Sequence, residues 1–173
     1  MALAVTIDRV DVGFTFCPSY NPLAKQDHTA SVWRPLVVGK YPVISFAHGM
    51  KHGNDDIMYN NMMLSSLASE GYIIIAHRAA WNIYCWDQTK DQGGTLGWIL
   101  ASPLYQNMID FSAKTGLMGY SMGGAATFKS AANWNYVVKF NVEGAVALHA
   151  AYPVPAAVLV PMLVSSGTNE FVT

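Results

Sequence analysis

The chain has 173 residues, of which 52% are hydrophobic and 12% are charged, and its formal net charge is −1. A chain of this length and composition has the size of one domain with a substantial core, so we expect a single domain over residues 1–173. No run of lysines or arginines is present, which argues against a nucleic-acid partner.

The first part of the chain predicts an edge strand or hairpin, a loop and a buried strand. Residues 5–16 (VTIDRVDVGFTF) partly alternate bulky β-forming and polar side chains, which is typical of an edge strand or hairpin. Residues 21–29 are polar, and we expect a loop there. The apolar, β-branched run YPVISFAHG at 41–49 ends in glycine, a pattern typical of a strand buried on both faces.

The rest of the chain alternates predicted helices and buried strands. Residues 55–71 place apolar side chains at helical spacing, with acids at the start and Gly71 as a C-terminal stop. A second helix is expected from Met122 to Asn133. Further strands are expected at 72–79, 114–121, 144–152 and 161–167. This alternation predicts an α/β fold with a mainly parallel sheet and helices on both of its faces.

The apolar stretch at 145–164 and the N-terminus bear on membranes and targeting. The stretch is long enough to suggest a membrane span, but three prolines interrupt it, so we expect no span and interpret it as two buried strands joined by a loop. The N-terminal residues lack a basic segment followed by an apolar block. No signal peptide is therefore visible, and a cytoplasmic location is favoured.

A G-x-S-x-G element lies where the strand at 114–121 gives way to the helix that follows. It reads Gly119-Tyr120-Ser121-Met122-Gly123. In such an element the serine occupies a sharp, strained turn, and glycines two residues to either side avoid collisions with neighbouring backbone. The helix directs its first N–H groups toward the serine hydroxyl, so the amide of Met122 can donate to an oxyanion. Ser121 is therefore the candidate nucleophile.

Four motifs carry a resemblance to the α/β hydrolases. In chain order they are YPVISFAHG, LASEGYIIIA, GLMGYSMGGAAT and PMLVSSGTNEFV, and together they span residues 41–172. The sequence is similar to the branch that contains dienelactone-hydrolase-like proteins, platelet-activating-factor acetylhydrolases, chlorophyllases and bacterial polyester cutinases. The resemblance implies the α/β-hydrolase fold and a serine hydrolase that acts on small-molecule carboxylic esters through an acyl-enzyme, without a cofactor.

The resemblance also assigns roles to individual residues. Ser121 matches the nucleophile and Met122 the oxyanion-hole donor of the elbow. Met50 follows a His-Gly pair and matches the second oxyanion-hole donor, while His48 of that pair corresponds to a residue that shapes the loop. Glu170 matches the acid that orients the catalytic histidine, although the family more often has aspartate there.

The histidine that completes the triad is absent from its usual place. In the family it follows the acid, on a loop after the eighth strand, whereas this sequence stops three residues after Glu170. We therefore expect a domain truncated at its C-terminus that lacks the last strand and helix. His149 is the alternative candidate for the base, because its strand is expected to lie between those of Ser121 and Glu170; a role in the core is the other interpretation. His77 stands where the family frequently has aspartate.

Two functions remain open on these grounds. The chain is an esterase-type serine hydrolase if a base is supplied, and thioesterase or peptidase chemistry would use the same nucleophile. Alternatively it is a catalytically silent hydrolase-fold protein that binds without reaction, because loss of a triad histidine costs on the order of 10⁶ in turnover. A sheet that lacks its last strand would have an unpaired edge, so self-association is expected.

Other clusters are weighed against structural explanations. His48, His52, Asp55 and Asp56 lie close together, but acids also begin the predicted helix, where they complement its dipole, so we expect no metal site. Cysteines 17 and 85 lack metal-type spacing, which leaves buried thiols or a disulfide open. The aromatic residues at 81–88, with Trp98 and Tyr105, either line an ester pocket or pack in the core.

Overall fold

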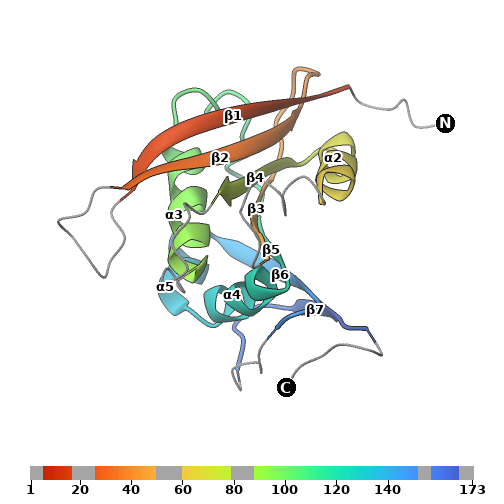
Figure 1. Ribbon diagram of the computed structural model, residues 1–173. Coiled ribbons are helices and arrows are strands. Elements are labelled where there is room, and N and C mark those ends of the chain that lie inside the picture. Colours follow the sequence, from red (N-terminus) through yellow and green to blue (C-terminus); the bar gives the residue numbers. More distant parts are fainter. Residues whose placement is uncertain (1–5, 17–25, 50–59, 79–87, 152–156, 168–173) are drawn as a thin grey trace.

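The computed structural model describes residues 6–16, 26–49, 60–78, 88–151 and 157–167. These residues form a seven-stranded sheet in the order β1-β2-β4-β3-β5-β6-β7, together with helices α2 to α5 (Figure 1). The strands are β1 Ile7–Phe16, β2 Gln26–Pro35, β3 Val43–Ala47, β4 Ile73–Arg78, β5 Thr115–Tyr120, β6 Val142–Leu148 and β7 Met162–Ser165. The helices are α2 Asn61–Ser69, α3 Gln88–Ala101, α4 Met122–Ala131 and α5 Trp134–Lys139.

Five neighbouring strands, from β4 through β3, β5 and β6 to β7, run parallel. Strand β4, which lies between β2 and β3, is buried on both faces: its residues 73–76 are all 0% exposed. A strand buried on both faces reads as a continuous apolar run, because neither face needs polar side chains. For this reason the short runs alone predicted the strands, and the predicted α/β fold with a mainly parallel sheet is confirmed.

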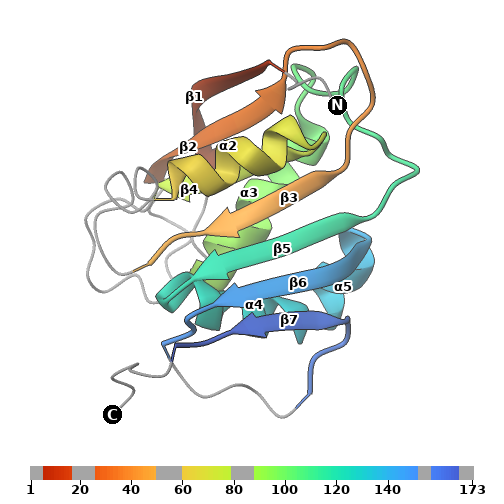
Figure 2. The same cartoon turned by 90° about the vertical axis from the view of Figure 1, so that its right-hand side faces the viewer.

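Helices cover both faces of the sheet, as the sequence predicts (Figure 2). Helix α2 packs on one face, where Leu64 and Ala68 join a core cluster with Trp33 and Phe46 of the strands. Helices α3 and α4 lie on the other face, whose core cluster includes Leu96 of α3 and residues of β3, β4 and β5. Helix α3 also supplies polar side chains to this interior.

The antiparallel hairpin β1–β2 extends the sheet beyond β4 (Figure 1, red and orange). Of the edge strand or hairpin expected over residues 5–16, the edge strand is confirmed as β1, whereas its partner β2 was not predicted. The loop expected at 21–29 is wrong for its last part, because β2 already begins at Gln26, whose backbone pairs with Phe16. Pairing between two backbones needs no apolar side-chain pattern, so the polar sequence did not reveal this end of the strand.

Helices α2 and α4 agree with expectation except at one end each. The acids expected to begin α2 lie outside the described residues, and the helix starts at Asn61. It stops before Gly71, which adopts φ 94°, a left-handed conformation that glycine allows at low cost. Helix α4 ends at Ala131 and not at the expected Asn133, because the Asn133 side chain accepts a hydrogen bond from the Asn135 N–H and begins α5.

Helix α3 has no counterpart among the predicted elements. Its buried positions include Gln88, Asp91, Gln92 and Thr95 besides Leu96 and Ile99. Because polar residues occupy much of the face that points into the protein, the apolar spacing that normally indicates a helix is weak. None of the helices in the described part of the chain is long and apolar enough to cross a membrane.

Strand β7 is more exposed than predicted. Leu163 and Val164 are 65% and 50% exposed, so the expectation of a buried strand is wrong here. The reason is its position: among the described residues β7 pairs with β6 alone and forms the edge of the sheet.

Charged side chains connect the hairpin to β4. The hydroxyl of Ser31 donates to Asp11 Oδ1 over 2.7 Å, and Arg78 Nη2 lies 2.5 Å from the same oxygen. Arg9 lies 3.5 Å from it. Burial raises the pKa of Asp11, but the hydrogen bonds from Ser31 and Arg78 and the charges of both arginines outweigh this and hold that pKa below its ordinary value.

We predict that Asp11→Asn lowers the free energy of unfolding at pH 7 by less than about 1 kcal/mol, because solvent screens ion pairs of an exposed carboxylate. The folded pKa is lowered, so the carboxylate stabilises the fold above its unfolded pKa of 3.8, and this contribution is lost as the pH falls through the folded value. Urea unfolding of both proteins at pH 7 and at about pH 2 measures it. A difference of equal size at both pH values would contradict the prediction.

Candidate functional site

Three histidine or serine residues directly follow neighbouring parallel strands. His48 follows β3, Ser121 follows β5 and His149 follows β6. Strand β5 lies between β3 and β6, and β6 lies between β5 and β7, as the resemblance to the α/β hydrolases implies for the strand of His149. In parallel sheets ligands bind beyond the carboxyl ends of the strands, so this edge is the candidate site.

The backbone of Ser121 is strained. The residue connects β5 to α4 with φ 56° and ψ −116°. A non-glycine residue held at positive φ costs on the order of 1–3 kcal/mol, and such residues cluster at functional sites because the surrounding structure imposes the conformation. A sharp strand-to-helix turn of this kind presents a serine hydroxyl at the top of the sheet.

Two glycines allow this turn to form. A Cβ at Gly119 would lie 2.1 Å from the carbonyl oxygen of Gly123, and a Cβ at Gly123 would lie 2.0 Å from the carbonyl oxygen of Ala47. Real Cβ atoms never approach backbone so closely. The turn therefore packs against itself and against the end of β3 through bare backbone, as the sequence motif predicts.

Backbone hydrogen bonds hold the serine from both sides. The Ser121 N–H donates to the Leu148 carbonyl over 2.9 Å, and the Ser121 carbonyl accepts from the N–H groups of Ala151 and Ala125, each at 3.1 Å. The segment after β6 thus runs alongside the turn. These hydrogen bonds hold Ser121 in its strained backbone conformation, which would otherwise relax.

Met122, a predicted oxyanion-hole donor, is the first residue of α4. The first N–H groups of a helix have no partner inside it and carry the positive end of the helix dipole. An amide at this position, next to the serine, can donate to negative charge that develops on a substrate oxygen. The second predicted donor, Met50, lies outside the described residues.

His48 and Gly49 end the segment after β3. His48 is 2% exposed, and its Nδ1 lies 2.7 Å from the carbonyl oxygen of Gly49. Because a carbonyl can only accept, Nδ1 is the donor, which fixes the protonated nitrogen of the ring. The ring centroids of His48 and His77 are 4.9 Å apart. These contacts agree with a loop-shaping role for His48.

His149 lies on the segment after β6, which hydrogen-bonds to the Ser121 backbone. Its φ is 48°, its N–H donates to Ser165 over 2.7 Å, and its ring lies 5.9 Å from that of Tyr120, edge to face. Among the residues that the structure describes, no hydrogen bond joins the Ser121 hydroxyl to an imidazole.

Several predicted residues fall outside the described part of the chain. They are Met50, Glu170, the two cysteines and three members of the histidine and aspartate cluster, namely His52, Asp55 and Asp56. Within the described ranges, no group of three or more histidine, cysteine, aspartate or glutamate side chains is arranged to hold a metal ion.

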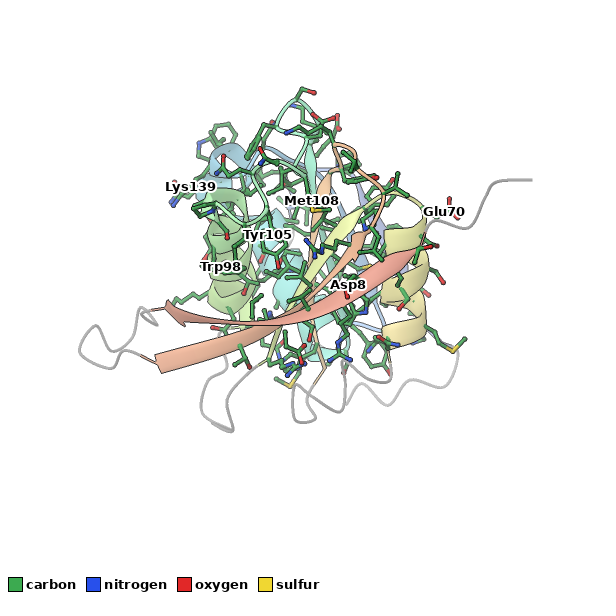
Figure 3. All side chains as sticks on the ribbon, turned by 90° about the horizontal axis from the view of Figure 1, so that it is seen from above. Asp8, Glu70, Trp98, Tyr105, Met108 and Lys139 are labelled. Carbon is green, nitrogen blue, oxygen red and sulfur yellow. The ribbon has the colours of Figure 1, made fainter. Side chains whose placement is uncertain are left out.

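Of the aromatic residues singled out in the sequence, the structure describes Trp98 and Tyr105, and both pack with the core. Trp98 of α3 and Tyr105, both labelled in Figure 3, meet edge to face with ring centroids 6.1 Å apart. Tyr105 is 3% exposed and belongs to the same core cluster as Leu96. Burial raises the pKa of its hydroxyl. Of the two explanations left open for these residues, core packing is the one that the contacts support.

Sequence reasoning missed Gln92 and Thr127, which lie beneath the turn. Gln92 is 0% exposed and its amide donates to Thr127 Oγ1 over 3.0 Å; Thr127 in turn donates to the carbonyl of Gly123 over 2.8 Å. The only signal in the sequence was a glutamine four residues after Gln88 in a stretch without apolar periodicity.

The chain was compared with known proteins. A family model described as Chlorophyllase matches residues 4–154, a range that includes the hairpin, the elbow and His149 but not β7 or Glu170. No curated protein matches the chain.

We predict that Gly123→Ala lowers the free energy of unfolding by about 3 kcal/mol, because the added methyl group would collide with the Ala47 carbonyl and force α4 away from the end of β3. Gly144→Ala on β6 is the matched control: the nearest atom to its added Cβ is 3.8 Å away, so it should change stability by less than about 1 kcal/mol. Urea unfolding of both variants measures the difference. Equal stability of the two would show that the approach at Gly123 is looser than the structure indicates.

Proposed function

The chain belongs to the chlorophyllase family, whose fold is that of the α/β hydrolases, and from this we propose that it is a serine hydrolase acting on carboxylic esters. The observation that carries the proposal is the strained backbone of Ser121, at φ 56°, between β5 and α4. A hydroxyl held on such a turn next to a helix N-terminus has the position of an acyl-accepting nucleophile.

In the proposed reaction the Ser121 oxygen attacks the carbonyl carbon of the ester. A histidine base takes the hydroxyl proton, the carbonyl π electrons move to the oxygen, and a tetrahedral oxyanion forms. The intermediate expels the alcohol, which receives the proton from the base, and leaves an acyl group on Ser121. Water, activated by the same base, then releases the acid and restores the serine.

Two backbone amides stabilise the oxyanion in this proposal, those of Met122 and Met50. The position of Met122 at the start of α4 supports its role, and the hydrogen bond of His48 to the Gly49 carbonyl supports that of Met50, because this carbonyl shares a planar peptide group with the Met50 nitrogen. Donors that are fixed before the reaction need no reorganisation, and loss of one costs about 10²–10³ in rate.

The base and its orienting acid complete the proposal. His149 is the candidate base among the described residues, because the segment that carries it hydrogen-bonds to the Ser121 backbone. Glu170 is the proposed acid. The chain needs no cofactor for this chemistry, and we propose that residues 1–173 act as one domain.

A second candidate function is binding without catalysis. It is favoured by one observation: in the described part of the chain, the Ser121 hydroxyl makes no hydrogen bond to a histidine. A turn of this geometry without a base would keep an oxyanion-binding corner and lose nearly all turnover.

We predict that a fluorophosphonate probe labels Ser121 and that Ser121→Ala is not labelled. The probe reacts only with a serine whose hydroxyl a base activates, so it separates the two candidate functions. Peptide mass spectrometry locates the modification. If the folded wild-type chain remains unlabelled, the binding function replaces the hydrolase.

The same assay tests the base. His149→Gln should slow labelling of Ser121 at least ~10²-fold if His149 takes the hydroxyl proton. Thermal unfolding of this variant serves as the control for its fold. Labelling at the wild-type rate would assign the base to another histidine.

We further predict self-association through the β7 edge, where Leu163 and Val164 are exposed on a strand with one partner among the described residues. Val164→Lys should shift the molar mass toward the monomer in light scattering after size exclusion. Val138→Lys on α5, where Val138 is 57% exposed, is the matched control and should change nothing. A monomeric wild-type chain would contradict the prediction.

A further inference from the structure

Gln92 is a buried polar residue at the point where α3 packs against the sheet and α4. It lies on α3, is 0% exposed, and faces β3, β5 and α4 at once. Its side-chain amide Nε2 lies 3.0 Å from the Met118 carbonyl oxygen, 3.0 Å from Thr127 Oγ1 and 3.3 Å from the Ser45 carbonyl oxygen. One NH₂ group therefore links three elements that meet beneath the serine.

The link to Thr127 leads directly to the turn. The Thr127 hydroxyl accepts from Gln92 and donates to the carbonyl oxygen of Gly123. The same hydroxyl fills the space next to Gly119, where an added Cβ would lie 2.5 Å from it. By holding the Thr127 hydroxyl in place, Gln92 thus affects the packing around both glycines that flank Ser121.

The link to β3 is reciprocal. While the Gln92 amide donates to the Ser45 carbonyl, the Ser45 hydroxyl donates to the Gln92 backbone carbonyl over 3.1 Å. Ser45 is itself 0% exposed. Helix α3 is therefore attached at this one residue to the strand that leads to His48 and to the strand that leads to Ser121.

Burying the Gln92 amide costs stability, which indicates that its hydrogen bonds serve to position their acceptors. Gln92 Oε1 is buried and makes no hydrogen bond in the described structure, and an unpaired buried polar atom costs about 1–3 kcal/mol. An apolar side chain of similar length would fill the same space without this penalty. What the amide adds is direction, because each hydrogen bond restricts where its acceptor lies.

We propose that Gln92 is a positioning residue that holds the Ser121 turn against the end of β3, and so fixes where the Ser121 hydroxyl and the Met122 amide lie relative to His48 and Gly49. This inference rests on the proposed function for its consequence in catalysis, but the link itself is independent of any reaction. A displacement of about 1 Å in such a site costs up to ~10²-fold in rate.

The test compares Gln92→Met, which keeps length and volume but removes the hydrogen bonds, with Thr95→Val. Thr95 is a matched control, since it is 1% exposed on the same helix and, among the described residues, its hydroxyl bonds only to the Asp91 carbonyl of that helix. Two readouts are needed. The first is the hydrogen–deuterium exchange of the peptide that covers residues 117–127, and the second is the rate at which the fluorophosphonate probe labels Ser121.

In Gln92→Met we expect the amides of 117–127 to exchange at least ~10-fold faster and labelling to slow by ~10–100-fold. Thr95→Val should leave both unchanged. Gln92→Glu gives a further readout: its carboxyl group can donate only while protonated, so labelling should fall as the pH rises, whereas the wild-type chain should not lose labelling in that direction.

Wild-type exchange rates in Gln92→Met would overturn the positioning role, whatever the chemistry of the site. Faster exchange with unchanged labelling would overturn its importance for the serine. Failure of the wild-type chain to react with the probe would instead overturn the proposed hydrolase, while the exchange data still decide whether Gln92 holds the turn.

Discussion

The close packing of the Gly123 backbone against the carbonyl of Ala47 is the constraint on which the candidate site depends. No side chain separates α4 from the end of β3 at this point, so the distance between the two is set by backbone alone. The segment after β3 and the turn after β5 therefore share one edge of the sheet. The hydrogen bonds of Gln92 and Thr127 act at the same place, from the side of the core.

Much of this architecture could be predicted because its physical cause is local. A run such as residues 73–76 is apolar at every position. The turn at Ser121 is recognisable because steric contacts require glycine at 119 and 123. The parts that could not be predicted depend on tertiary contacts. Helix α3 buries glutamines and a threonine, so its sequence lacks apolar spacing. The sequence of β7 is typical of a buried strand, but the strand lies at an edge of the sheet. The first residues of β2 are extended because they pair with β1. The two glycines of the motif were recognised, whereas Gln92 was not.

The three ion pairs found between described residues lie away from Ser121. They join the hairpin to itself or to β4, through Asp8, Asp11 and three arginines. At the Ser121 turn the structure offers oriented backbone dipoles and the start of α4. Under the proposed function, amides held in this way would stabilise an oxyanion without reorganising during the reaction.

The positive φ of Ser121 costs stability, whereas its hydroxyl serves the proposed chemistry. Glycine adopts such a backbone with little penalty, so a change of this one codon from serine to glycine would relax the turn, leave every backbone hydrogen bond in place and make the protein more stable. Selection for stability alone would therefore favour glycine at this position and remove the hydroxyl. Serine at this strained backbone position is the expected signature of a residue whose oxygen atom has a function, which in the proposed reaction is nucleophilic attack.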